Sequence, residues 1–310
     1  MGRRARVLLW VSAAAVALTG AGCGLGAGRG TAGVTLTVTR GFGSSQIASI
    51  SRGRVPGSET VMRMLERSFR VGTRYGGGFV QAIDGIAGGS SRLDWFYYVN
   101  GIEAPAGAAS TSVSRGDRIW WDLHDWAATD TIPAVVGSFP EPFVHGIGGR
   151  RLPTILECAS DVAVACAHVS AALSKVGVQT PRQLLGTGSG SSSLTIVVGT
   201  WADLHRQLVA DLIEHGPSAS GIYARFAGPG GRTLELLDPR GSVVRTLAAG
   251  AGLVAATADA SSEPTWLVTG TDGAGVLAAA RALSPSRLRD HFALAVQRGT
   301  YLPIPLNGSR

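Results

Sequence analysis

Apolar and polar residues alternate from Val34 to Thr39, the pattern of a strand with one buried face. Further strand-like runs, rich in apolar, β-branched and aromatic residues, cover residues 47–55, 79–83, 95–99 and 117–122. Glycine-containing turns separate these runs. The pattern therefore predicts a mostly β-structured N-terminal segment.

One amphipathic helix is expected between the second and third strands. Ser58, Glu59 and Thr60 supply N-cap and first-turn residues. Apolar side chains then recur at helical spacing for about three turns, at Val61, Met64, Leu65 and Phe69. A single helix packed on a mixed sheet is the β-grasp arrangement. Residues 34–126 are thus predicted to form an α+β domain of the β-grasp type.

After a connector at residues 127–151, rich in Gly and Pro, strands alternate with helices. Within the connector, residues 135–143 resemble a strand and a docked loop more than a free tether. Strands are expected at 152–157, 194–198, 222–226, 234–237, 243–247, 253–256 and 265–268. Helices are expected at 161–175, 202–214, 273–283 and 287–296, before an extended tail at 302–305. This alternation predicts a layered α/β domain over residues 152–310.

The aromatic residues concentrate in the strands at 95–99 and 117–122. Successive residues of a strand point to opposite faces, so both faces of this sheet carry aromatic side chains. A single helix covers only one face of the sheet. The aromatic side chains on the other face, which include Phe96 and Tyr98 and form the second aromatic row, must therefore be covered by something else. One interpretation is a platform for a flat ligand, formed by Trp95, Phe96, Tyr98, Asn100, Trp120 and Trp121. The other is a contact with the following domain, with Asn100-Gly101 as an ordinary turn.

Five short stretches of this segment resemble a known family, and they occur in the family's order. They are Thr37–Gly43, Gly57–Leu65, Tyr75–Val80, Trp95–Gly101 and Gly116–Trp121. They look like the transcobalamin C-terminal-like domain of unknown function, which is found in many bacterial surface proteins. The resemblance covers about 90 residues and implies a β-grasp fold. It also suggests cobalamin as a ligand, although the α-barrel partner of the transcobalamins is missing here. No other cofactor is expected.

The first residues predict export. Arginines at positions 3, 4 and 6 precede the apolar run Val7–Leu18 and a stretch of small residues that ends at Cys23. We expect a signal peptide at 1–22, and Cys23 resembles the lipidated cysteine of bacterial lipoproteins. Gly20 departs from that motif, which usually has an aliphatic residue there, so plain secretion is the alternative. Residues 23–33 read as a flexible tether. A lipid on Cys23 would hold the protein on the outer face of the cell membrane.

Charge and cysteine usage exclude some classes of function. The formal net charge is +7, and it falls to +4 without the three arginines of the leader. The remaining arginines are scattered, so a nucleic-acid partner is not expected. Cys158 and Cys166 form an even pair in an exported chain, which favours a disulfide. On one continuous helix they would be about 12 Å apart, so a bridge requires Cys158 at a strand end and Cys166 in the next helix. Two buried free thiols are the alternative.

Two junctions between a strand and a helix carry the same Gly-Thr pair, Gly199-Thr200 and Gly270-Thr271. Helix N-termini at neighbouring strand ends can hold an anion, whereas ordinary N-capping explains the same residues. The glycine-rich run at 186–193 precedes a strand and therefore does not fit a dinucleotide fingerprint.

No catalytic constellation is visible. No serine occupies a nucleophile elbow, no Cys–His arrangement can be argued, and the six histidines are not spaced as metal ligands. We therefore expect a non-catalytic, exported surface protein that binds a corrinoid or another flat polar molecule. The alternative is a structural module that contacts envelope proteins or cell-wall polymers. An enzyme in the C-terminal domain is a minor third hypothesis.

Overall fold

The computed structural model describes residues 33–89, 92–188, 192–259 and 263–306. The signal peptide, Cys23 and nearly all of the tether predicted above lie outside these residues. Within the described residues, no helix combines the length and the apolar character needed to cross a membrane.

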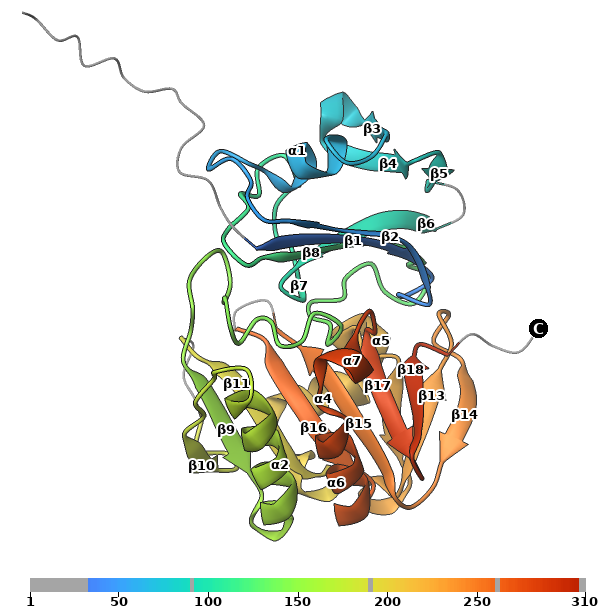
Figure 1. Ribbon diagram of the computed structural model, residues 1–310. Helices are drawn as coiled ribbons and strands as arrows, with labels where there is room; N and C mark the ends of the chain where they lie inside the picture. The colour runs from blue at the N-terminus through green and yellow to red at the C-terminus, as the bar shows by residue number, and fades with distance from the viewer. Residues whose placement is uncertain (1–32, 90–91, 189–191, 260–262, 307–310) are drawn as a thin grey trace, which may run out of the picture.

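The N-terminal domain is built on a five-stranded mixed sheet (Figure 1). Its strand order is β2-β1-β8-β6-β7, and β1 runs parallel to β8 at the centre. The strands are β1 Val34–Arg40, β2 Ser45–Arg52, β6 Leu93–Val99, β7 Ile102–Glu103 and β8 Arg118–Asp125. Apolar side chains of β1 alternate into the core because the strand period is two. The predicted β-grasp class is confirmed.

Helix α1, Val61–Glu66, packs on one face of this sheet and is shorter than the predicted three turns. It begins one residue after Thr60, whose hydroxyl oxygen accepts a hydrogen bond from the Arg63 N–H at 3.2 Å. The segment that follows forms a separate antiparallel sheet, of β3 Val71–Arg74, β4 Phe79–Ile83 and β5 Ile86–Ala87, with the short 3-10 helix η1 Tyr75–Gly77 inside it. The strand predicted at 79–83 is correct but belongs to this small sheet.

The C-terminal domain has a seven-stranded sheet of order β10-β9-β11-β16-β15-β17-β18. Its first four strands are parallel and the rest pair antiparallel. These strands are β9 Thr154–Cys158, β10 Arg182–Leu184, β11 Leu194–Thr200, β15 Ala251–Thr257, β16 Thr265–Gly270, β17 Ala293–Gln297 and β18 Thr300–Ile304. The layered α/β class predicted from the sequence is confirmed.

Helices cover one face of the large sheet, and shorter elements cover the other (Figure 1). The helices α2 Ala163–Ser174 and α6 Gly273–Ala282 pack on the first face. The second face carries α3 Trp201–Leu204, α4 Leu208–Glu214, α5 Pro217–Ser220 and a small sheet of β12 Ala224–Ala227, β13 Thr233–Leu237 and β14 Val243–Leu247. Short 3-10 helices, η2 Ser160–Val162 and η3 Pro229–Gly231, complete the domain. Burial on both faces explains the continuous apolar run of β11.

Two helix predictions are wrong in the C-terminal domain. The helix expected at 202–214 is divided into α3 and α4. The helix expected at 287–296 is instead the short α7 Pro285–Leu288 followed by strand β17. The helix ends at Arg289, whose ψ of 128° is not helical, and Asp290 then adopts a positive φ of 58° before the strand. The predicted extended tail is strand β18, which pairs with β17 across a tight turn at Arg298-Gly299.

The connector is packed into the protein. Val135 donates its N–H to the Gly101 carbonyl at 2.8 Å, and Val136 donates to the Phe292 carbonyl at 3.1 Å. Phe139 and Phe143 are buried against Trp266 of β16. The connector therefore bonds to both domains, as a docked loop does.

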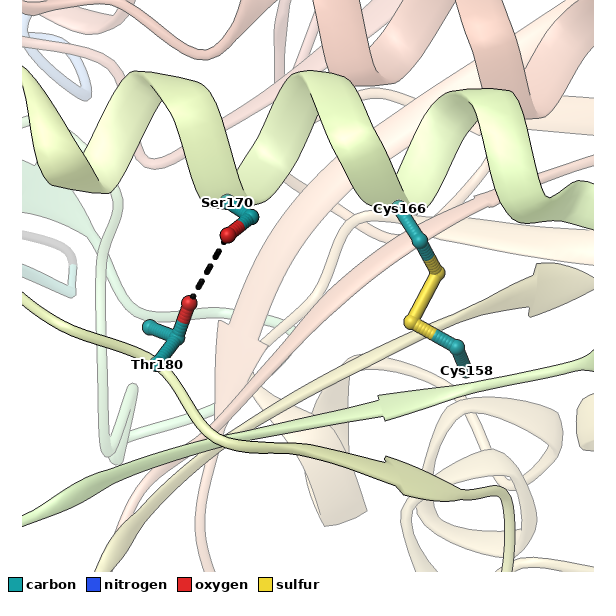
Figure 2. Close-up of a disulfide and its surroundings, with 4 residues drawn as sticks. All are labelled: Cys158, Cys166, Ser170 and Thr180. Carbon is teal, nitrogen blue, oxygen red and sulfur yellow. Dashed lines mark hydrogen bonds between the residues drawn. A yellow bond between two sulfur atoms is a disulfide. The ribbon is translucent and has the colours of Figure 1, made fainter.

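Cys158 and Cys166 are joined by a disulfide, with their Cα atoms 6.3 Å apart (Figure 2). Cys158 ends β9 and Cys166 lies in the first turn of α2, the arrangement that the eight-residue separation requires. One turn further along α2, the Ser170 and Thr180 hydroxyls hydrogen-bond at 3.2 Å. The bridge and this bond fix α2 to the edge of the sheet.

Replacing both cysteines, Cys158→Ser with Cys166→Ser, is expected to lower the free energy of unfolding by about 2–3 kcal/mol, because the closed loop is short. Urea denaturation of both proteins measures the difference. A reducing agent should lower the stability of the wild type by a similar amount and leave the double variant unchanged. A wild type that is insensitive to reduction would contradict the prediction.

Candidate functional site

The second aromatic row of the β-grasp sheet faces the C-terminal domain. Tyr98 and Trp120 are buried, and each packs against Phe292, with ring centroids 5.5 Å and 5.1 Å away. Tyr223 and Leu237 of the C-terminal domain join the same cluster. The sequence allowed either a ligand platform or a contact between the domains, and the structure shows that this row forms the contact between the domains. Tyr98 and Trp120 do not form an open platform for a ligand.

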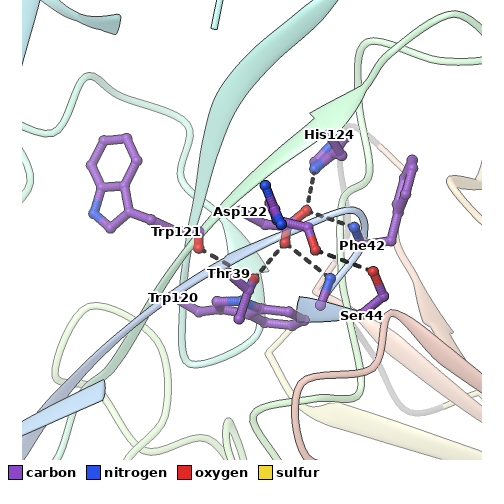
Figure 3. Close-up of polar contacts among 9 residues, drawn as sticks. Thr39, Phe42, Ser44, Trp120, Trp121, Asp122 and His124 are labelled. Atoms are coloured by element: carbon purple, nitrogen blue, oxygen red, sulfur yellow. Dashed lines mark hydrogen bonds and ion pairs between the residues drawn. The ribbon is translucent and has the colours of Figure 1, made fainter. Parts of the chain in front are cut away.

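A buried carboxylate, Asp122 of β8, organises this interface (Figure 3). It accepts hydrogen bonds from the backbone N–H groups of Phe42 and Gly43, both at 2.9 Å. The Thr39 hydroxyl also donates to it, and that hydroxyl accepts a bond from the Trp120 indole N–H at 2.7 Å. The carboxylate thereby ties the loop after β1 to the aromatic strand. Donors on several sides offset the cost of burying its charge.

His124 lies 2.9 Å from Asp122, measured from Nδ1 to Oδ2. Its ring is stacked between Phe42 and Phe96, at centroid distances of 4.6 Å and 4.4 Å. Phe292 meets the same ring edge-on at 5.3 Å. With one ring nitrogen on the carboxylate and both ring faces covered, His124 serves as part of the interdomain packing.

Asn100 is a structural residue and not a ligand contact. Its side chain is fully buried, and its amide donates to Asp117 Oδ1 at 2.9 Å and to the Gly146 carbonyl at 2.8 Å. Its amide oxygen accepts from the Arg118 N–H at 2.9 Å. The backbone of Asn100 has a positive φ of 55°, as the turn interpretation predicted.

A cavity of about 350 Å³ lies in the N-terminal domain, beside the aromatic side chains on the other face of the sheet, Trp95, Tyr97 and Trp121. Strand β7 pairs only with the last two residues of β6, so the rest of that edge has no strand partner among the described residues. The cavity lies beside this part of β6. Its aromatic lining residues are Phe79, Trp95, Phe96, Tyr97, Trp121 and Trp126. Three of the six predicted ligand-binding residues, Trp95, Phe96 and Trp121, therefore line this cavity.

Three carboxylates also line this cavity, those of Asp94, Glu103 and Asp130. Asp94 accepts a hydrogen bond from the Trp126 indole N–H at 2.8 Å and so positions that ring. Glu103 accepts one from the Ile132 N–H at 2.9 Å. Burial raises the pKa of Glu103 to about 7, the Ile132 N–H opposes the shift, and the nearby Asp130 charge adds to it. The carboxylates give an otherwise apolar cavity a negative charge.

The Gly-Thr junctions are occupied by capping carboxylates. Thr200 and Asp203 form a reciprocal capping box at α3, in which the Thr200 N–H donates to Asp203 at 2.9 Å. Asp272 caps α6 and accepts from the Gly275 N–H at 2.9 Å. The anion site predicted at Gly199, Thr200, Gly270 and Thr271 is therefore corrected to ordinary capping, because each helix start already holds a carboxylate. Within the described residues, no group of three His, Cys, Asp or Glu side chains could hold a metal ion.

Sequence reasoning missed most of the polar half of the cavity. Glu103 comes from β7 and Asp130 from the connector, and neither forms a motif with the aromatic strands. Asp94 and Trp126 flank the two strands in the sequence, 32 residues apart, and their hydrogen bond joins the strand ends. The only sequence signal of this polar side was the position of Asp94 just before the first aromatic run and of Trp126 just after the second.

Residues 58–125 match the family described as Domain of unknown function (DUF4430). The match lies within the segment whose motifs resemble the transcobalamin C-terminal-like domain and covers less than half of the chain. No curated protein matches.

Among solved structures, the chain is similar to a proposed metal-binding protein from Ruminococcus gnavus ATCC 29149, with 20% identity and a TM-score of 0.26. That similarity covers 30% of this chain and 97% of the other. Haptocorrin in complex with Cbi is similar at 16% identity and a TM-score of 0.24, over 30% of this chain and 25% of haptocorrin. At these values neither likeness bears on the function of this chain.

The variant Phe292→Ala is expected to cost about 3–5 kcal/mol of stability, because it removes the ring that four side chains of the N-terminal domain contact. Tyr75→Ala is the control, since that ring is 86% exposed and its loss should change stability by less than about 0.5 kcal/mol. Chemical denaturation measures both. Equal effects of the two substitutions would contradict the assigned interface.

Glu103→Gln should stabilise the protein at pH 8 by about 1–2 kcal/mol, after allowance for partial solvent exposure, and have little effect near pH 5. The folded-state pKa of about 7 lies above the usual 4.5. The wild type therefore loses stability as pH rises through this range, while the glutamine variant does not. Glutamine keeps the acceptor for the Ile132 N–H. Denaturation curves of both proteins at the two pH values test the sign, and a less stable variant at pH 8 would contradict it.

Proposed function

We propose that this chain is an exported surface protein, lipid-anchored through Cys23, that binds a small molecule in the cavity beside β6 without catalysing a reaction. The observation that carries the proposal is the aromatic and acidic lining of that cavity. Concave, mostly apolar cavities with a few polar groups are the usual form of small-molecule sites. The export and the anchor rest on the sequence of the first 23 residues.

The size of the cavity favours a ligand smaller than a corrinoid. Its volume of about 350 Å³ is close to the lower end of the range for ligand sites, roughly 300–1,000 Å³. The aromatic row with Tyr98 and Trp120, which would have offered a wider flat surface, is covered by the C-terminal domain. Cobalamin remains a compound to test because of the family resemblance, but a single substituted ring suits the cavity better.

The second candidate function is a structural module that contacts envelope proteins or cell-wall polymers. The observation in its favour is that the aromatic side chains are largely consumed in packing within the chain. Tyr98 and Trp120 are buried between the domains, and Trp95 and Trp121 are at most 4% exposed. If the protein is a structural module, the cavity binds no small molecule. The titration described next therefore distinguishes the two functions.

The cavity is tested by titration with para-tert-butylbenzyl alcohol and with cyanocobalamin, followed by calorimetry and tryptophan fluorescence. We expect the alcohol to bind the wild type and to lose at least about tenfold in affinity in Ala104→Phe, which fills part of the cavity. Ala163→Phe, at an exposed position of α2, is the matched control and should bind as the wild type does. Failure of both compounds to bind the wild type would favour the structural role.

The anchor is tested by Cys23→Ala in cells. Because two or more acyl chains give stable membrane attachment, the wild type should fractionate with the membrane and be labelled metabolically by a palmitate analogue, and the variant should carry no label. Cys158→Ser serves as the cysteine control and should stay on the membrane. Failure of a palmitate analogue to label the wild type would overturn the lipid anchor.

A further inference from the structure

The cavity beside β6 has the charge pattern of a site for a cation. Three carboxylates line it, from Asp94, Glu103 and Asp130, and no basic side chain is among the residues that line it. Within the described part of the chain, none of the three carboxylates forms an ion pair. The hydrogen bonds they receive from Trp126, Ile132 and Thr131 come from neutral donors. Their negative charge is therefore not neutralised by the protein.

The aromatic rings add to this preference. The face of an indole or phenyl ring carries partial negative charge and attracts cations, most strongly organic ammonium groups with apolar substituents. Trp126 is half-buried and held by Asp94, so a ring and a carboxylate are fixed together at one side of the cavity. A hydrophobic lining suits the alkyl or aryl part of such a ligand, and the carboxylates suit its charge.

We propose that the cavity selects a small organic cation, an ammonium group carried on an aromatic or branched alkyl body. This inference rests on the proposed ligand-binding function and specifies the chemical class of the ligand. The buried indole N–H of Trp121, itself a lining residue, has no acceptor among the described groups.

Binding of such a cation depends on the ionisation of Glu103. The titratable groups around it are Asp130 of the connector, Asp94 and Tyr97 of β6, which also line the cavity, and Tyr98 behind it. Burial keeps the pKa of Glu103 at about 7. Burial also raises the pKa values of Tyr97 and Tyr98, so neither tyrosine becomes charged in the same range. Glu103 is thus the group expected to change charge between pH 6 and pH 8.

The test compares two probes of the same shape on the full-length protein. One is the para-(hydroxymethyl)phenyl-trimethylammonium ion, and the other is para-tert-butylbenzyl alcohol, in which carbon replaces the charged nitrogen. At pH 8 the cation should bind at least about tenfold more tightly than the neutral probe. Its affinity should fall as the pH is lowered from 8 to 6. The quaternary ammonium does not titrate, so this change reports on the protein.

Glu103→Gln is the decisive variant, because it removes the charge and keeps the acceptor for Ile132. It should lose about tenfold in affinity for the cation, bind the neutral probe unchanged, and show no dependence on pH in this range. Glu214→Gln, an exposed acid in the C-terminal domain, is the matched control and should leave both affinities unchanged. Denaturation of each variant verifies that it is folded.

The outcomes separate the two proposals. Equal affinity for the two probes would overturn the selection of a cation and leave the proposed function standing. Unchanged cation affinity in Glu103→Gln would overturn the role of that carboxylate and, with it, the selection. If neither probe binds the wild type, both this inference and the cavity as a ligand site fall.

Discussion

The arrangement of the two domains depends on the hydrogen bonds of one buried carboxylate. Asp122 has no solvent exposure, and a charge in that position is stable only when donors surround it. The donors come from the loop after β1, from Thr39 and from His124. Because these bonds fix that loop against β8, Phe42 and His124 meet Phe292 in a defined geometry. The polar cluster thus determines where the aromatic interface lies.

Close packing at the loop reinforces the same constraint. Gly43 has a positive φ of 77°, and a Cβ atom at this position would lie 1.7 Å from the backbone oxygen of Asp290. Only glycine therefore allows the β-grasp loop to approach the C-terminal domain so closely. A variant that displaces this loop would also remove two hydrogen bonds to the Asp122 carboxylate, because the N–H groups of Phe42 and Gly43 donate them. Backbone conformation, charge burial and aromatic packing are coupled at a single loop.

The sequence predicts the strands and helices more clearly than it predicts which parts of the chain pack on the faces of each sheet. The strands at 79–83 and 243–247 were predicted with their bounds, since short β-rich runs between turns have few alternatives. The run at 292–296 was misread as helix, because five buried apolar residues show no period that separates the two states. Alternation in β6 and β8 showed that both faces needed a cover. The identity of that cover depends on Phe292, which lies almost two hundred residues away in the chain. Glu103 and Asp130 could not be assigned to a site for the same reason.

The use of both sheet faces for packing limits where a ligand can be held. One face is filled by α1 and the core around it, and the other by the C-terminal domain. One place beside these packed surfaces is the edge of β6 that the two-residue strand β7 leaves unpaired. At this edge the protein keeps a partly buried carboxylate, Glu103, although its raised pKa shows that the charged form is disfavoured there. A neutral side chain would make the fold more stable at neutral pH. The retained charge is understandable where a bound cation offsets its cost, and that is the physical reason to read the cavity as a site for a ligand of opposite charge.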